Sequence, residues 1–294
     1  MSHETVAFAW VESPLQLLSA VEYAAVTSLP VVIVPRAGAV QLTETASHLS
    51  RLDLPAGVQI SEPRLSPATG FASHRAHWIV GDVYSGHVRA ALAVSRPHLL
   101  TVVDDGLSSV RLDAVLTGAE SLERPDRDES LAVRTIAALA RTSLVVLEAR
   151  NELELFSCWM LRHNALITND FSWLRANATL GADRAGTIVV GSAAVTDGLI
   201  DEGEYLDWLR AFAPEGIYLP HRRETDESLA RIAELPGLTV ERTSLPIELV
   251  LAGSTGLTIT GFGSSALTTL ARVLEGSGAT FIDVPSVREI EAAQ

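Results

Sequence analysis

Short apolar runs alternate along this chain with segments in which apolar residues recur every three or four positions. The runs are apolar throughout and do not alternate with polar side chains. Strands that are buried on both faces have this pattern, and they occur in parallel sheets covered by helices. The chain is therefore predicted to be α/β. The predicted strands are 6–11, 30–34, 77–80, 98–103, 143–147, 165–168, 187–190, 216–219, 238–241, 257–260 and 280–283.

Helical periodicity fills the intervals between these runs. The first helix has a clear start, because Ser13 suits the N-cap and Pro14 the first helical position. The acidic, irregular segment 118–130 is predicted to be a surface loop, and 246–248 can begin either a helix or a strand. The predicted helices are 15–23, 41–52, 86–95, 131–141, 152–163, 201–213, 226–234, 266–275 and 287–293.

The alternation of strands and helices restarts after the stretch between Gly181 and Gly186. We therefore expect two Rossmann-like domains, an acceptor-side domain over 1–183 and a donor-binding domain over 184–294. Two such domains facing each other across a cleft suit the GT-B glycosyltransferase architecture.

Charge and composition narrow the class of partner. The 294 residues carry a net charge of −14, which argues against nucleic acid as the main ligand. Of the residues, 47% are hydrophobic, which is ample for a packed core. A single cysteine, Cys158, permits no internal disulfide, which fits a reducing compartment. The first residues lack the pattern of a signal peptide, and no apolar run is long enough to span a membrane. We expect a cytoplasmic protein.

Three polar clusters follow predicted strands: Asp104-Asp105-Gly106, Pro220-His221-Arg222-Arg223 and Gly263-Ser264-Ser265. Ligands of open α/β sheets bind beyond the carboxyl ends of strands. A carboxylate and a histidine can act as base and acid, and histidine, arginine and serine side chains suit a phosphate. Each cluster also has a structural interpretation, as a turn, a solvated loop or a helix cap.

The last cluster lies between a strand and a helix. Backbone N–H groups at a helix N-terminus, together with two hydroxyls, favour an anion. We interpret Gly263, Ser264 and Ser265 as a phosphate site.

The order of the three clusters resembles that of bacterial sialyltransferases and polysialyltransferases, inverting GT-B enzymes with an acidic-acidic-Gly motif, a His-Pro-type motif and a serine motif. Glu12-Ser13-Pro14-Leu15-Gln16 and Leu245-Pro246-Ile247-Glu248 add to the resemblance, which extends over residues 12–266. The histidine here follows a proline instead of preceding one, as in the polysialyltransferase-like branch.

The resemblance implies transfer of a sialic-acid-like nonulosonic acid from a CMP donor to a glycan or glycolipid, with no metal required. Asp104 would be the general base, with Asp105 second, and His221 would assist the departing phosphate. Ser264 and Ser265 would bind that phosphate, Arg222 the phosphate or the sugar carboxylate, and Glu248 the cytidine ribose. A surface-polymer acceptor would imply peripheral membrane association.

Other functions remain open from the sequence. Gly261-x-Gly263-x-x-Ala266 with Asp283 matches a dinucleotide fingerprint, which would make this an NAD-binding protein. A GT-B transferase using another nucleotide sugar and a non-enzymatic binding module are further alternatives. Two further interpretations are weaker. A metal-binding motif at Asp126-x-Asp128 would lie in a charged loop. A hydrolase nucleophile at Ser264 or Ser265 would lack a complete Gly-x-Ser-x-Gly motif. The sequence does not identify the acceptor, the linkage or the oligomeric state.

Overall fold

A computed structural model describes residues 6–105, 108–124, 128–161, 163 and 165–283. The chain forms two compact units, Met1–Asn177 (unit 1) and Ala178–Gln294 (unit 2). The division lies shortly before the predicted boundary at 183/184, because residues 178–183 pack with unit 2. Within that segment, Gly181 donates its N–H to Ala252 O and its carbonyl accepts the Ser254 hydroxyl.

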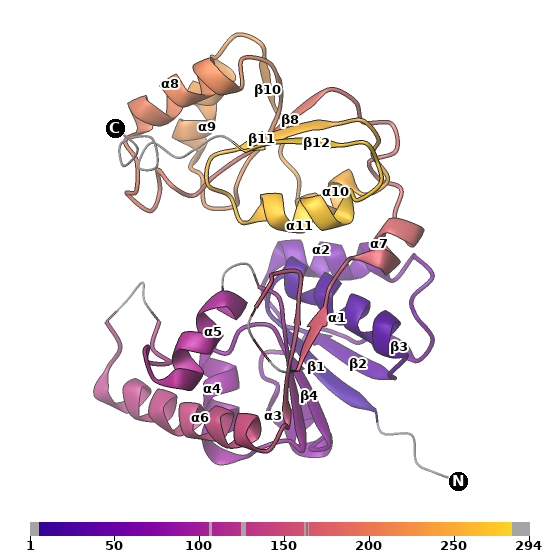
Figure 1. The fold of residues 1–294 in the computed structure, drawn as a ribbon, viewed down its shortest axis with the longest axis vertical. Coiled ribbons are helices and arrows are strands. Elements are labelled where there is room, and N and C mark those ends of the chain that lie inside the picture. Colours follow the sequence, from indigo (N-terminus) through magenta and orange to yellow (C-terminus); the bar gives the residue numbers. More distant parts are fainter. Residues whose placement is uncertain (1–5, 106–107, 125–127, 162, 164, 284–294) are drawn as a thin grey trace. The chain divides into compact units, whose positions relative to one another are not determined.

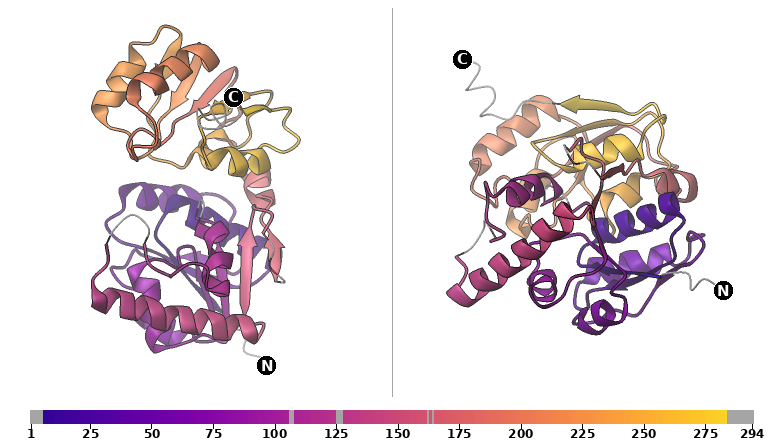
Figure 2. Two further views of the ribbon diagram at one scale, coloured as in Figure 1. Left: turned by 60° about the vertical axis from the view of Figure 1, so that its left-hand side comes forward. Right: turned by 60° about the horizontal axis from the view of Figure 1, so that its bottom comes forward.

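Unit 1 is a parallel seven-stranded sheet in the order β3-β2-β1-β4-β5-β6-β7 (Figure 1). Helices cover both of its faces, with α1, α2 and α7 on one side and α3 to α6 on the other (Figure 2). Its strands are β1 (Ala7–Val11), β2 (Val31–Pro35), β3 (Val58–Ile60), β4 (His77–Val80), β5 (Leu99–Val103), β6 (Leu153–Ser157) and β7 (Leu166–Thr168). Its helices are α1 (Pro14–Thr27), α2 (Val40–Leu49), α3 (Ala68–Ser73), α4 (Gly86–Val94), α5 (Ser108–Thr117), α6 (Leu131–Ala149) and α7 (Ser172–Asn177).

Unit 2 is a parallel five-stranded sheet in the order β10-β9-β8-β11-β12. Helices α8 and α9 pack on one face, and α10 and α11 pack together on the other (Figure 1). Its strands are β8 (Thr187–Val190), β9 (Gly216–Leu219), β10 (Leu238–Val240), β11 (Thr258–Gly261) and β12 (Thr280–Asp283). Its helices are α8 (Glu202–Phe212), α9 (Asp226–Ala233), α10 (Ile247–Leu251) and α11 (Ala266–Val273).

These two units confirm the prediction of an α/β chain built from Rossmann-like parallel sheets. The start of α1 also follows the prediction: Pro14 is its first residue, and the Ser13 hydroxyl accepts the Gln16 N–H at 3.2 Å. Segment 246–248 begins a helix, α10. The predicted helix over 287–293, together with Gly106 and Asp126, lies outside the described residues.

Two predictions between 143 and 163 are wrong. Residues 143–147 continue helix α6, whose buried residues Ala137, Ala140, Leu144 and Leu147 keep a helical spacing. Segment 152–163 holds strand β6 where a helix is predicted. Glu154 breaks the apolar pattern of this strand in the sequence. Its carboxylate accepts hydrogen bonds from the hydroxyls of Tyr23 and Thr101. Because Tyr23 and Thr101 are distant from Glu154 in the sequence, the local hydrophobic pattern does not indicate that this carboxylate can be buried in a strand.

Candidate functional site

The carboxyl ends of β1, β4 and β5 bring acidic side chains together in unit 1. Strand order reverses between β1 and β4, and such a switch point is where open α/β sheets bind ligands. Glu12 and Ser13 follow β1, Asp82 follows β4 beyond Gly81, and Asp104 and Asp105 follow β5. Gly81 is needed here because a Cβ at this position would lie 2.1 Å from the Gln16 side chain.

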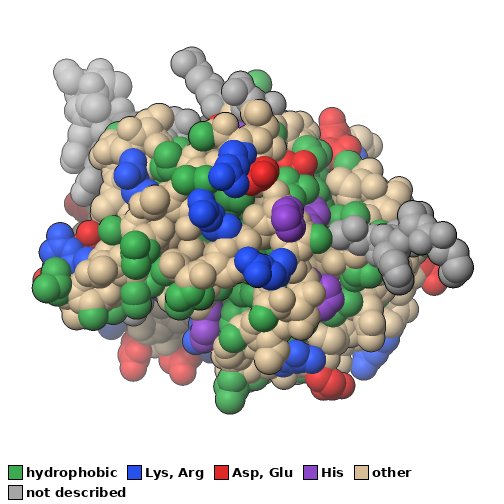
Figure 3. All heavy atoms as spheres, turned by 90° about the horizontal axis from the view of Figure 1, so that it is seen from below, with side chains coloured by type: hydrophobic (Ala, Val, Ile, Leu, Met, Phe, Trp, Pro, Cys, Tyr) green, Lys and Arg blue, Asp and Glu red, His purple; other side chains and the backbone are tan. Residues whose placement is uncertain are grey.

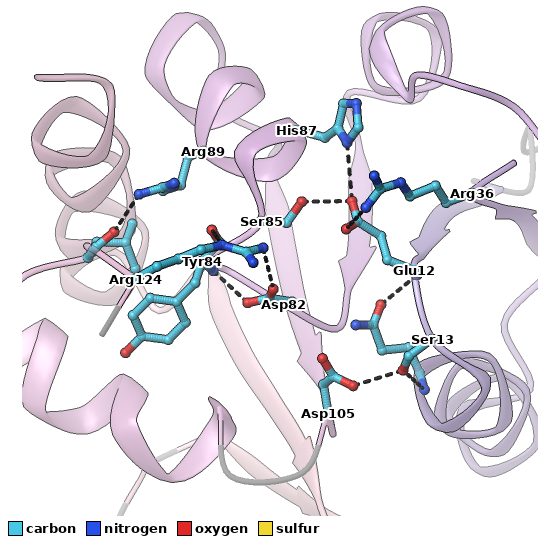
Figure 4. Close-up of polar contacts among 12 residues, drawn as sticks. Glu12, Ser13, Arg36, Asp82, Tyr84, Ser85, His87, Arg89, Asp105 and Arg124 are labelled. Carbon is cyan, nitrogen blue, oxygen red and sulfur yellow. Dashed lines mark hydrogen bonds and ion pairs between the residues drawn. The ribbon is translucent and has the colours of Figure 1, made fainter. Parts of the chain in front are cut away.

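Glu12 is the centre of a hydrogen-bonded group at this edge (Figure 4). Its Oε1 accepts the Trp10 indole N–H at 2.6 Å. The same oxygen accepts the Ser85 hydroxyl at 2.7 Å. His87 and Arg36 each approach its carboxylate to 3.3 Å. Burial alone would raise the pKa of Glu12, but the bonds from Ser85 and Trp10 and the charge of Arg36 hold it below its usual range. Glu12 is therefore a fixed negative charge that orders the edge.

Asp104 and Asp105 have very different surroundings. Asp104 is 0% exposed. Its Oδ1 accepts the Ser157 and Ser109 hydroxyls at 2.6 and 3.0 Å, and its Oδ2 accepts the Cys158 N–H at 2.6 Å. Burial raises the pKa of Asp104 against the opposing effect of these hydrogen bonds. The side chain fastens the end of β5 to the end of β6, and its full burial makes Asp105 the more accessible of the two carboxylates.

Asp105 is only partly buried, and its carboxylate points toward the start of α1 (Figure 4). Its Oδ1 accepts the Ser13 hydroxyl at 2.8 Å. Of the two adjacent carboxylates, Asp105 is the one that a bound hydroxyl group can reach.

Asp82 is an acidic residue at the same edge that the sequence reasoning missed. Its Oδ1 accepts the Tyr84 N–H at 2.7 Å, and Arg124 approaches its Oδ2 to 3.4 Å (Figure 4). Burial, and next the charge of Asp105, raise the pKa of Asp82 to about 6. The signal was present in the sequence, because Asp82 follows a predicted strand in the same way as Asp104 does.

Unit 2 has its own switch point, between β8 and β11. The neighbouring strands β8, β9 and β11 end in Gly191-Ser192, Pro220-His221 and the turn over 262–265. The structure thus brings the second and third predicted clusters to one edge of one sheet. It adds Ser192, which the sequence analysis did not single out although it follows a predicted strand in the same way.

His221 is held by its neighbours. Its Nδ1 accepts the Arg223 N–H at 3.2 Å, so the proton of the neutral ring lies on Nε2. Its own backbone N–H donates to Glu224 Oε2 at 2.5 Å, and Glu224 Oε1 accepts the Tyr218 hydroxyl at 2.6 Å. Burial, and then the charges of Arg223 and Arg222, lower the pKa of His221. The ring is therefore a neutral donor through Nε2.

Glu224 is a further residue to which the sequence analysis gave no role. A Cβ on Gly191 would lie 2.3 Å from Glu224 Oε2, so glycine at the end of β8 leaves room for this carboxylate. Burial raises the pKa of Glu224 although Tyr218 and the His221 N–H oppose that rise. No sequence motif indicated that Glu224 fixes the backbone of His221.

The turn after β11 has the features of an anion site. Gly263 has a φ of +55°, a left-handed conformation that favours glycine. Ser265 is the N-cap of α11, yet its side chain makes no capping hydrogen bond. Ser264 and Ser265 are both half-buried, and neither hydroxyl has a hydrogen-bond partner in the described part of the chain. The two hydroxyls are available to a ligand instead of serving the helix.

The two arginines beside His221 differ in whether they have an ion-pair partner. Arg223 forms a bidentate ion pair with Asp197, at 2.6 and 2.8 Å. Arg222 is exposed and pairs with no residue that the structure describes. Of these two arginines, Arg222 is therefore the one that is available to bind a phosphate.

Glu248, for which the resemblance implies contact with the cytidine ribose, is buried in unit 2. Its side chain is buried between α10 and α11, where Oε1 accepts the Thr269 hydroxyl at 2.6 Å. Burial raises its pKa. These contacts make Glu248 a link between two helices, and its role toward a ribose stays a prediction from the resemblance.

The dinucleotide fingerprint has part of its expected setting. Strands β11 and β12 are parallel neighbours, with Gly261 opposite Asp283, and α11 lies between them in the chain. The side chain of Asp283 is outside the described part. A dinucleotide fold starts with this motif, whereas unit 2 starts with β8.

Among the described residues, no three histidine, cysteine, aspartate or glutamate side chains are grouped to hold a metal ion. Metal independence stays a prediction from the resemblance. No helix in the described ranges is long and apolar enough to cross a membrane.

Comparison with solved structures finds distant likenesses. The first is UGT2 of Phytolacca americana, complexed with UDP-2-fluoro-glucose and pterostilbene, at 14% identity over 100% of this chain and 83% of that chain, with a TM-score of 0.45. The glycosyltransferase VinC in complex with DTDP is 12% identical over 98% and 90%, with a TM-score of 0.39. The glycosyltransferase SnogD from Streptomyces nogalater is 12% identical over 97% and 90%, with a TM-score of 0.37. No protein-family model and no curated protein sequence matches the chain.

Proposed function

We propose that this protein is an inverting glycosyltransferase of GT-B type that uses a nucleotide-activated sugar. The observation that carries the proposal is the carboxyl edge of the unit 2 sheet. The Nε2–H of His221 and the exposed Arg222 follow β9 there, and two hydroxyls follow β11, with β8 as the one strand between them. These groups are neutral or cationic donors, which suit a departing phosphate.

The donor we propose is a CMP-activated nonulosonic acid, and the acceptor a glycan or glycolipid hydroxyl. Support for this narrower statement comes from the motif set in the sequence. As CMP leaves, its phosphate gains charge, and His221 donates a hydrogen bond to it from Nε2. Ser264, Ser265 and Arg222 hold the same phosphate, and Gly263 lets the turn form.

Asp105 is our proposed general base. It takes the proton of the acceptor hydroxyl as that oxygen attacks the anomeric carbon. Asp104, fully buried beside it, holds the turn that carries Asp105. Asp82 and Glu12 lie at the same edge, after β4 and β1.

Release of CMP from CMP-N-acetylneuraminic acid tests the proposal without knowledge of the acceptor, since water can replace it. We expect slow hydrolysis by the wild-type protein and none by His221→Ala. Arg51→Gln, at an exposed position of unit 1, is the control for loss of a surface charge. Hydrolysis of a UDP or dTDP sugar with no hydrolysis of the CMP sugar would keep the glycosyltransferase and replace the donor. If no nucleotide sugar is hydrolysed and none binds, the proposal is wrong.

A further inference from the structure

An apolar groove lies in unit 1 between α3 and α4, with Trp78 of β4 at its base. Its volume is about 470 Å³, within the range typical of small-molecule sites. Pro67, Phe71, Ala90 and Val94 are among its lining residues. None of the predicted clusters contributes to it.

The wall formed by α3 is held in place by packing. The Trp78 indole N–H donates to Phe71 O at 3.1 Å, and the two rings lie 4.2 Å apart. A Cβ on Gly70 would lie 2.1 Å from the Phe8 ring, so glycine permits the close approach of α3 to the sheet. The groove is therefore preformed, which lowers the cost of binding a ligand.

A cationic pocket of about 330 Å³ adjoins the groove, and Arg75, Val94 and Ser95 line both. Arg96 and Arg150 also line this pocket, with Glu152 as its carboxylate. None of the three arginines forms an ion pair with a described residue. Arginine and histidine side chains gather among apolar ones on the face shown in Figure 3. The three guanidinium groups are exposed, so they are available to contact an anion.

We propose that the groove binds the hydrocarbon tail of a single-chain amphiphile whose acidic head lies among Arg75, Arg96 and Arg150. The apolar length and the cationic end match the two halves of such a molecule. The arginines precede β4 and β5 and follow α6, so they lie at the amino edge of the sheet, away from the carboxyl-edge carboxylates. The inference does not depend on the proposed glycosyltransferase activity.

Calorimetric titration with laurate, below its micelle concentration, tests the groove. We expect saturable binding to the wild-type protein. Ala90→Trp, on an exposed position of α4 that lines the groove, should weaken it about tenfold or more, because the indole fills the volume that the tail needs. Ala138→Trp, on an exposed position of α6, is the matched control and should bind as the wild type does. Ala72→Trp blocks the groove from α3 and serves if Ala90→Trp does not fold.

The charged end has its own test. Arg75→Gln with Arg96→Gln should weaken laurate binding about tenfold, because each removes a charge-assisted contact, while Arg51→Gln should leave it unchanged. Inorganic phosphate alone should bind far more weakly than dodecyl phosphate. The proposal is overturned if laurate and dodecyl phosphate do not bind, or if the blocked variants bind as the wild type does. Binding only to vesicles that contain phosphatidylglycerol would also overturn it, because that result would indicate a membrane-docking surface.

Discussion

Ser13 and Asp105 lie 92 positions apart in the sequence, and the Ser13 hydroxyl donates a 2.8 Å hydrogen bond to Asp105 Oδ1. The same hydroxyl accepts the Gln16 N–H and so caps α1. One serine thus orders both the start of the first helix and the carboxylate that follows β5. This relationship fixes Asp105 across the switch point of unit 1.

Asparagine at the two adjacent acidic positions should have opposite effects. Asp105→Asn removes the proposed base, so donor hydrolysis should fall by about 10²- to 10⁴-fold with little change in unfolding. Asp104→Asn leaves a buried hydrogen-bond donor mismatched, so the free energy of unfolding should fall by about 1–3 kcal/mol. Turnover and urea unfolding of both variants check this. A stable, inactive Asp104→Asn beside an active Asp105→Asn would return the role of base to Asp104.

Glu224 should act on turnover through His221. Glutamine has one acceptor oxygen, whereas Glu224 accepts from both the Tyr218 hydroxyl and the His221 N–H. We expect Glu224→Gln to lower kcat about tenfold and to change the Kd of CMP much less, because one buried hydrogen bond is lost. Glu234→Gln, at the exposed end of α9, is the control. A purely structural role would lower stability and leave the kcat of the folded fraction unchanged.

Arg222 and Arg223 form a matched pair of tests. Arg222→Gln should raise the Kd of CMP about five- to tenfold, since a charge-assisted phosphate contact is lost. Arg223→Gln should have little effect, because that guanidinium is engaged by Asp197 and its backbone N–H is retained. Equal losses in both variants would show that the arginines act through general charge and not through a contact.

Glu22 should make stability depend on pH. This carboxylate is 1% exposed and accepts the N–H groups of Trp173 and Leu174 at the start of α7. Burial raises the pKa of Glu22 from 4.5 to about 7. The folded state therefore holds a proton that the unfolded state has released, and this stabilising contribution is full below pH 4.5 and is lost as the pH rises through about 7.

Glu22→Gln isolates that contribution. Relative to the wild type, the free energy of unfolding of the variant should rise with pH between about 4.5 and 7, by at most about 1.4 kcal/mol per pH unit. Urea unfolding at several pH values measures the difference. A difference that is constant across this range would contradict the raised pKa.

The parallel sheets could be predicted from sequence because their strands are apolar without alternation, and the start of α1 because Ser13-Pro14 is a local signal. The prediction failed at residues 143–147, which were expected to form a strand and belong to α6. Their apolar run fits the pattern of a buried strand, but Leu144 and Leu147 continue the buried face of helix α6 that begins at Ala137. A short apolar run does not distinguish the two without its partners.

The candidate site was predictable to a similar extent. His221 follows β9, and Ser264 and Ser265 follow β11, the two strands on either side of β8, so all three residues lie at the same edge of one sheet. The choice between Asp104 and Asp105 depends on which side chain turns inward toward Ser157, and Glu224 matters through a backbone contact. Those are properties of packing between distant segments, which no local motif encodes.

Calorimetric titration with CMP, UDP, GDP and NAD, without added metal, tests the central claim of a CMP-sugar site in unit 2 most directly. We expect CMP to bind in preference to the others, and Ser264→Ala with Ser265→Ala to weaken CMP binding about tenfold or more, because the proposed site places both hydroxyls on the phosphate. Binding of NAD alone, or of CMP with equal affinity to the double variant, would contradict it.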